Sequence, residues 1–298
     1  MMRRALAAGI VALAALQASA LAQPAGKRVY ISVDMEGISG ISGSDQTSLG
    51  QPEYARSRKL MAEDANAAIR GAFDGGATEV VVNDSHGGQR NLLPEDLDPR
   101  ARLISHSFKR HGMMEGLDDT FHAVMFVGYH AKAQAPRGLF AHTGSGVVRD
   151  LRINGVSVGE GGMNALLAGW YGVPVVLVTG DDVAVEEVRS SVRDVRGVTV
   201  KRAINGRAVE LHSLTGARKD IQDAARGAVG AIKPGSRAPV RLPQYRVELQ
   251  YNNFTYPEVA AAFREIELVS PDTVAFTRTS MPEAYRLIRV LYRFINPD

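Results

Sequence analysis

SVDMEGISG, residues 32–40, begins inside an apolar run that predicts a buried strand over residues 29–33. Asp34 and Glu36 therefore come where this strand ends, just before a glycine-rich turn. Side chains two residues apart in a strand point to the same side. Two carboxylates on one side repel each other and lose hydration, so they need a cation, a shared proton or solvent. A divalent metal ion is the sharpest of these solutions.

Residues 1–22 have the plan of a secretory signal peptide. A basic start, MMRR, precedes an apolar stretch over residues 5–16, and the small residues that follow fit a cleavage site. We expect cleavage after Ala22 and a periplasmic or secreted mature protein. The apolar run is short for a membrane span, so we expect no stable membrane association after cleavage.

The composition argues against several kinds of partner and site. The 298-residue chain has a net charge of +3, and removing residues 1–22 takes away two arginines and no acid, which leaves +1. This balance gives no argument for binding nucleic acid or an anionic membrane. Because the chain has no cysteine, any metal ion must be held by His, Asp, Glu or backbone oxygen.

Apolar strand-like runs alternate with helical patterns along the chain. Strands are expected at residues 29–33, 78–82, 101–104, 122–127, 147–153, 173–178 and 245–249. Helices are expected at residues 52–73, 159–171, 184–192, 214–232 and 282–294. This alternation predicts an α/β fold with a largely parallel sheet flanked by helices. We place a metal-binding catalytic region at residues 23–205 and a smaller C-terminal α/β region at residues 206–298.

Further candidate ligands follow the ends of the expected strands. His86 and His130 come after the second and third major strands, and Glu160 opens a helix. Open α/β sheets bind ligands beyond the carboxyl ends of their strands, so these side chains are expected to meet Asp34 and Glu36 there. The mixture suits zinc first, then manganese or cobalt. Five ligands exceed the need of one tetrahedral site and favour two ions that share a carboxylate.

Each ligand candidate also has a purely structural interpretation. Asp34 and Glu36 can cap a turn, and Glu160 can interact with a helix dipole. His86 can be a hydrogen-bonding loop residue, and His130 a buried and satisfied histidine. Singly, none of the five favours a metal over these interpretations. Their joint position at strand ends favours the metal site.

Two other aspartates lie at strand ends. Asp84 is either a further ligand or a residue that orients His86. Asp181, followed by Asp182, is expected to cap the helix that comes next. These residues therefore extend the same edge of the sheet without adding a firm ligand.

Six motifs occur in order along nearly the whole mature chain. They are SVDMEGISG at 32–40, VNDSH at 82–86, MEGLDDTF at 114–121, VGYHA at 127–131, GE at 159–160 with NA at 164–165, and GDD at 180–182. This series resembles the zinc D-aminopeptidases encoded with bacterial dipeptide-transport systems. The resemblance implies two zinc ions per subunit. It makes Asp34 the bridge between them, with Glu36 and His130 on one ion and His86 and Glu160 on the other.

The resemblance also supplies a catalytic residue and an assembly. His142, in FAHT at 140–143, matches the family's catalytic histidine, although the residues alone favour a loop hydrogen bond. It would transfer a proton or stabilise the tetrahedral oxyanion. Substrates implied are short peptides with an N-terminal D-residue, and the implied homo-oligomer is a ring-shaped decamer. Residues 143–146, TGSG, are richer in glycine than the family pattern.

The expected function is therefore metal-dependent hydrolysis that releases N-terminal D-amino acids from short peptides at a dinuclear zinc centre. The alternatives are another dinuclear hydrolase such as a phosphoesterase, a non-catalytic periplasmic peptide-binding protein, and a structural protein with an incidental metal. The ligand set at the strand ends argues against the last two, and the resemblance argues against the first.

Overall fold

The computed structural model describes residues 26–233 and 240–295. The expected signal peptide at residues 1–22 lies outside the described residues. Among the described helices, none combines the length and the apolar character needed to cross a bilayer.

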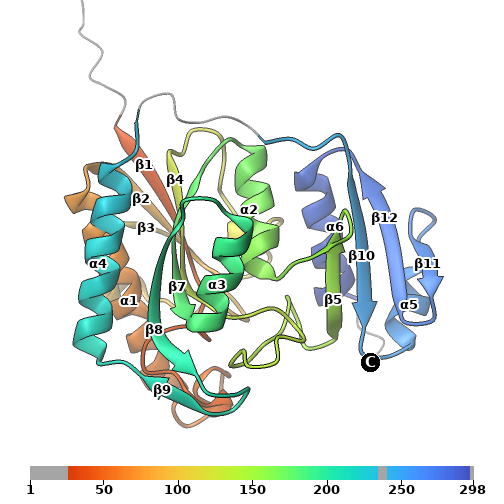
Figure 1. Cartoon of the computed structure of the whole chain (residues 1–298), viewed down its shortest axis with the longest axis horizontal. Coiled ribbons are helices and arrows are strands. Elements are labelled where there is room, and N and C mark those ends of the chain that lie inside the picture. Colours follow the sequence, from red (N-terminus) through yellow and green to blue (C-terminus); the bar gives the residue numbers. More distant parts are fainter. Residues whose placement is uncertain (1–25, 234–239, 296–298) are drawn as a thin grey trace, which may run out of the picture.

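The larger of two sheets has seven strands in the order β3-β2-β1-β4-β7-β8-β9 (Figure 1). Its strands are β1 Lys27–Val33, β2 Ala77–Asp84, β3 Arg102–Ile104, β4 Ala123–Tyr129, β7 Val175–Asp181, β8 Arg196–Ala203 and β9 Val209–Leu211. Neighbouring strands are parallel except for β8 and β9. The expected α/β fold with a largely parallel sheet is confirmed.

Helices cover both faces of this sheet, which explains the continuous apolar runs of its strands. They are α1 Tyr54–Asp74, α2 Glu160–Trp170, α3 Asp182–Ser191 and α4 Leu214–Gly230. In β1, Val29, Ile31 and Val33 pack in one core cluster with α1 and α4. Tyr30, on the opposite side of the strand, packs in a second cluster that includes residues of α2.

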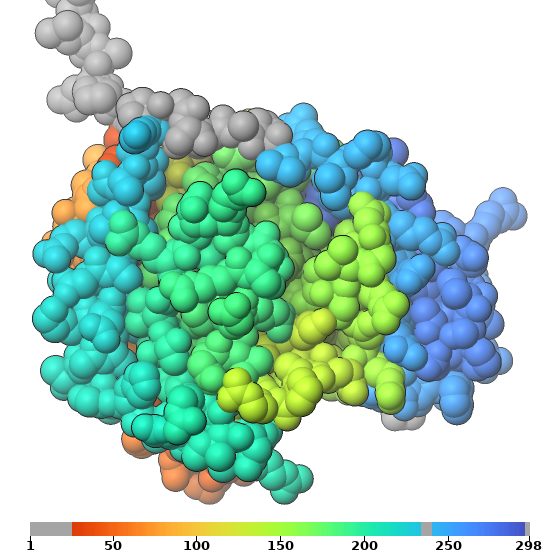
Figure 2. Space-filling view, viewed as in Figure 1, coloured from red at the N-terminus to blue at the C-terminus, as the bar shows by residue number. Residues whose placement is uncertain are grey.

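The second sheet is antiparallel, in the order β11-β12-β10-β5-β6. Its elements are β5 Val148–Ile153, β6 Val156–Ser157, β10 Tyr245–Tyr251, α5 Thr255–Ala260, β11 Glu267–Ser270, β12 Thr273–Arg278 and α6 Met281–Arg293. Helix α6 contacts β10 and β12 on one side and α2 on the other (Figure 1). In the space-filling view the two parts of the molecule pack directly against each other (Figure 2).

Several elements were absent from the sequence-based expectation. These are β6, β8, β9, α5, β11, β12 and the 3-10 turns Ser44–Gln46, Pro94–Asp96 and Gly112–Met114. Most are short, and β8 carries charged residues that interrupt its apolar pattern. The division at residues 205–206 stays a prediction. Segments cross it in both directions, because β5 belongs to the second sheet and α4 packs against α1.

A glycine sets the separation of α1 and α4. A Cβ atom at Gly71 would lie 2.3 Å from the carbonyl oxygen of Gln222 and 2.7 Å from the Cβ of Ala225. We expect Gly71→Ala to force the helices apart and lower the free energy of unfolding by about 1–3 kcal/mol, as overpacking does. Urea denaturation measures this change.

The matched control is Gly230→Ala at the end of α4, where an added Cβ would meet no atom within 4 Å. We expect this variant to unfold at the wild-type urea concentration or slightly above it, because alanine is the better helix former. Equal stability of the Gly71→Ala and wild-type proteins would contradict the close-contact interpretation.

Candidate metal centre

The central strand β1 gathers the predicted ligands at one edge of the larger sheet. Asp34 follows β1, which pairs in parallel with β2 on one side and β4 on the other. His86 follows β2, His130 follows β4, and Glu160 is the first residue of α2. The strand order alone therefore places Asp34 between the two histidines.

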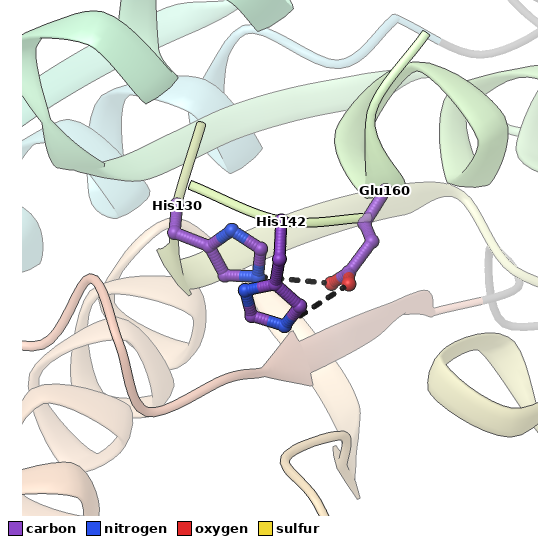
Figure 3. A group of neighbouring side chains, drawn as sticks. All are labelled: His130, His142 and Glu160. Carbon is purple, nitrogen blue, oxygen red and sulfur yellow. Dashed lines mark ion pairs between the residues drawn. The ribbon is translucent and has the colours of Figure 1, made fainter. Parts of the chain in front are cut away.

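The side chains at this edge form two groups, each with potential ligand atoms within 4.8 Å of one another. The first group contains Asp34, Glu36 and His86. The second contains His130, His142 and Glu160, whose rings and carboxylate face one another in Figure 3. All five predicted ligands and the predicted catalytic histidine thus lie together.

His86 has one ring nitrogen committed to the backbone. Its Nε2 lies 2.7 Å from the carbonyl oxygen of Thr47, which only accepts, so Nε2 carries a hydrogen. Its Nδ1 lies 2.9 Å from Glu36 Oε2 and 3.3 Å from Asp34 Oδ1. A nitrogen that faces two carboxylates needs a second proton or a shared cation. The backbone bond leaves Nδ1 available as the metal ligand.

His130 repeats this arrangement on the other side of Asp34. Its Nδ1 donates to the carbonyl oxygen of Ala131 at 2.9 Å. Its Nε2 lies 3.3 Å from Glu160 Oε2 and 3.5 Å from Asp34 Oδ2, yet has no hydrogen-bond partner among the described residues. A buried, unsatisfied nitrogen pointed at two carboxylates fits a metal ion, because a cation would satisfy all three groups.

Asp34 connects the two groups, since Oδ1 faces His86 and Oδ2 faces His130. Burial, followed by the charge of Glu36, raises the pKa of Asp34 to about 7. Burial acts to raise the pKa of Glu36 and of Glu160 as well. The neighbouring histidines outweigh burial, so the net pKa of both carboxyl groups is lowered. The site thus concentrates negative charge that positive groups must balance.

The grouping of ligands differs from the one that the resemblance implies. In the structure Glu36 is next to His86, and Glu160 is next to His130. The resemblance implies Glu36 with His130 and His86 with Glu160. The strand order accounts for the separation of the two histidines, because β2 and β4 lie on opposite sides of β1.

Asp84 supports the loop that carries His86 and belongs to neither group of ligands. Its carboxylate accepts hydrogen bonds from the backbone of Asn91 and Leu92, and the Asn91 side chain donates to the His86 carbonyl oxygen at 2.7 Å. These contacts favour the second interpretation of Asp84, as a residue that orients His86. At another strand end, Asp181 accepts from the Ala184 amide at 2.8 Å, which confirms the expected helix cap.

Lys201 in β8 is a supporting residue that the sequence did not reveal. Its buried Nζ donates to three backbone carbonyls in the segment that carries the first ligands, those of Glu36, Ile38 and Ile41. Burial lowers the pKa of Lys201 to about 8. Strand alternation places it on the same face as the buried Ala203, and this was the one available signal.

Both ring nitrogens of His142 have defined surroundings. Its Nδ1 donates to the carbonyl oxygen of Phe140 at 2.8 Å, and its Nε2 lies 3.7 Å from Glu160 Oε1. Burial, and then the charge of His130, lowers the pKa of His142. The bond to Phe140 places the hydrogen on Nδ1, and Nε2 faces Glu160. The backbone amide of Gly144 fixes the same Glu160 oxygen with a hydrogen bond of 2.6 Å.

A cavity of about 230 Å³ opens over these groups. Its lining includes Asp34, Glu36, His86, His142 and Glu160. His130 is buried behind this wall, with 5% of its surface exposed. A small polar ligand can therefore reach both groups of side chains from one side.

A known protein family matches most of this chain. The profile of peptidase family M55, described as D-aminopeptidase, matches residues 27–290. The chain belongs to this D-aminopeptidase family. The D-aminopeptidase of Bacillus subtilis strain 168 is 39% identical over 268 residues, which are 89% of this chain and 96% of that protein.

A solved structure shares the fold of the present chain. It is described as the zinc-dependent D-aminopeptidase DppA from Bacillus subtilis, a self-compartmentalizing protease. The TM-score is 0.86 at 36% identity, over 91% of this chain and 99% of DppA. The family and the enzyme class predicted from the motifs, a metal-dependent aminopeptidase, are confirmed.

A cation that satisfies the two histidines should stabilise the fold. We expect zinc ions added to chelator-treated protein to raise its Tm, because a ligand at a hundred times its Kd stabilises the native state by about 2.7 kcal/mol. His130→Ala should lose most of this rise, whereas His212→Ala, at an exposed position outside both groups, should keep it. Differential scanning fluorimetry measures both, and a full rise in His130→Ala would contradict the assignment.

Proposed function

We propose that this D-aminopeptidase family member releases N-terminal D-amino acids from short peptides at a dinuclear zinc site. The observation that carries the proposal is the paired histidine geometry. In both His86 and His130, one ring nitrogen donates a hydrogen bond to a backbone carbonyl oxygen and the other ring nitrogen faces buried carboxylates. The name of the Bacillus subtilis relative supports the D-aminopeptidase activity, and the description of DppA supports zinc.

In this proposal Asp34 would be shared by the two ions, since its two oxygens face the two histidines. Glu36 and His86 complete one site, and His130 and Glu160 complete the other, following the shortest contacts in the structure. Zinc bound there would polarise the scissile carbonyl and lower the pKa of water.

His142 is the proposed catalytic histidine. The bond from its Nδ1 to Phe140 fixes the tautomer, so Nε2 is the atom that takes and returns a proton. Burial lowers the pKa of His142, which favours the neutral ring. Because Glu160 is held by the Gly144 amide, the carboxylate stays in place beside Nε2 during the transfer.

We also propose export and self-assembly. Export to the periplasm or the exterior rests on the basic start and the apolar run at residues 5–16. Assembly into a homo-oligomer is supported by the description of DppA as self-compartmentalizing, and the resemblance makes a ring-shaped decamer the specific form.

The substrate class is tested by comparing D-Ala-D-Ala with L-Ala-L-Ala before and after chelation. We expect cleavage of the D-peptide only, with loss of activity when metal is removed and recovery when zinc is returned. p-Nitrophenyl phosphate, which a dinuclear phosphoesterase would hydrolyse, should stay intact. Preference for the L-peptide, or activity that survives complete metal removal, would refute the proposal.

The role of His142 is tested separately from metal binding. We expect His142→Ala to keep the wild-type zinc content and to lower kcat by about 10²–10⁴-fold, the usual contribution of general acid–base catalysis. Elemental analysis gives the zinc content and steady-state kinetics gives kcat. Loss of zinc would instead make His142 a ligand, and an unchanged kcat would remove it from the mechanism.

A further inference from the structure

The last turn of α6 forms part of the wall of the metal-centre cavity. Arg289, Tyr292 and Arg293 are spaced i, i+3 and i+4, so they lie on one face of the helix, and all three line the cavity. Tyr292 packs against Gly144, where an added Cβ would lie 2.6 Å from the Tyr292 ring. Gly144 in turn bonds Glu160, so α6 is held directly against the site.

Arg293 lies at the opening of the cavity, beside the His86 loop. Its Nη2 donates to the carbonyl oxygen of Gly87 at 2.9 Å, which anchors the guanidinium group. A guanidinium has five N–H donors in a planar fork, so this bond leaves most of them available. The side chain is exposed, and no carboxylate among the described residues lies within 4.0 Å of it.

Arg289 adds a second positive charge deeper in the same wall. It is 4% exposed, donates to the carbonyl oxygen of Lys109, and lies 5.9 Å and 5.8 Å from the ring centroids of Phe108 and Phe294. These contacts fix its position, and it too has no carboxylate of the described chain within 4.0 Å. Two guanidinium groups that lack an acidic partner in the described part of the chain thus face a cavity whose lining also includes three carboxylates.

The two guanidinium groups of this wall match the free C-terminal carboxylate of a short peptide. We propose that Arg293, with Arg289 behind it, binds the C-terminal carboxylate of the substrate while the N-terminal end of the peptide lies at the metal centre; this rests on the proposed function. Arginine suits the role because its fork binds a carboxylate through two parallel hydrogen bonds. The two arginines thereby restrict the enzyme to short peptides with a free C-terminus.

The test compares D-Ala-D-Ala with its C-terminal amide, which lacks the negative charge. We expect wild type to prefer the free acid by at least about tenfold in kcat/KM. Arg293→Gln should lower kcat/KM for the acid by about tenfold to a hundredfold, mainly through KM, because one charge-assisted bidentate contact is lost. Its activity on the amide should stay within about twofold of wild type, which a merely structural role would not produce.

Arg286→Gln is the matched control, since Arg286 is exposed on the same helix and does not line the cavity. It should keep the wild-type preference for the acid. Equal losses on acid and amide in Arg293→Gln would overturn the inference, as would a wild type that cleaves both equally well. The comparison of acid and amide in the wild-type protein tests the inference even if the variant misfolds. A wild type that cleaves neither peptide would refute the proposed function instead.

Discussion

Three carboxylates buried at one edge of a parallel sheet cannot share that space unless positive charge lies between them. Asp34, Glu36 and Glu160 are each less than 8% exposed. The protein answers with two histidines whose outer nitrogens are fixed by backbone carbonyls and whose inner nitrogens meet the acids. The geometry of each ring is therefore determined before any ion arrives, and the charge balance calls for a cation on each side of Asp34.

The fold supports this arrangement at a distance. Strand β1 lies inside the sheet, paired in parallel with β2 and β4. Separate core clusters cover its two faces. Lys201 holds the segment after β1 through three carbonyls, and Asp84 holds the loop after β2. The ligands are thus carried by loops whose backbone is bonded to rigid strands, as a preorganised site requires.

The sequence predicted which side chains meet at this edge, because buried parallel strands are continuous apolar runs and the polar residue that ends each run is visible. It could not predict which histidine lies beside which glutamate, because Glu36 lies in the loop after β1 and Glu160 at the start of α2, and their places in space depend on the whole fold. It also missed Lys201, whose partners are carbonyls about 160 residues away in the chain. The role proposed for Arg293 depends on which face α6 turns to the cavity, and this is set by the packing of α6 against β10, β12 and α2.

The position of α6 has a consequence for how the enzyme comes into being. The cavity takes part of its wall from Arg289, Tyr292 and Arg293, so a polypeptide still growing on the ribosome lacks this wall until translation has passed residue 293. The candidate ligands from Asp34 to Glu160 come earlier in the chain. The wall of the cavity is therefore complete only in a polypeptide that extends through residue 293, whereas a shorter one carries the candidate ligands without this wall.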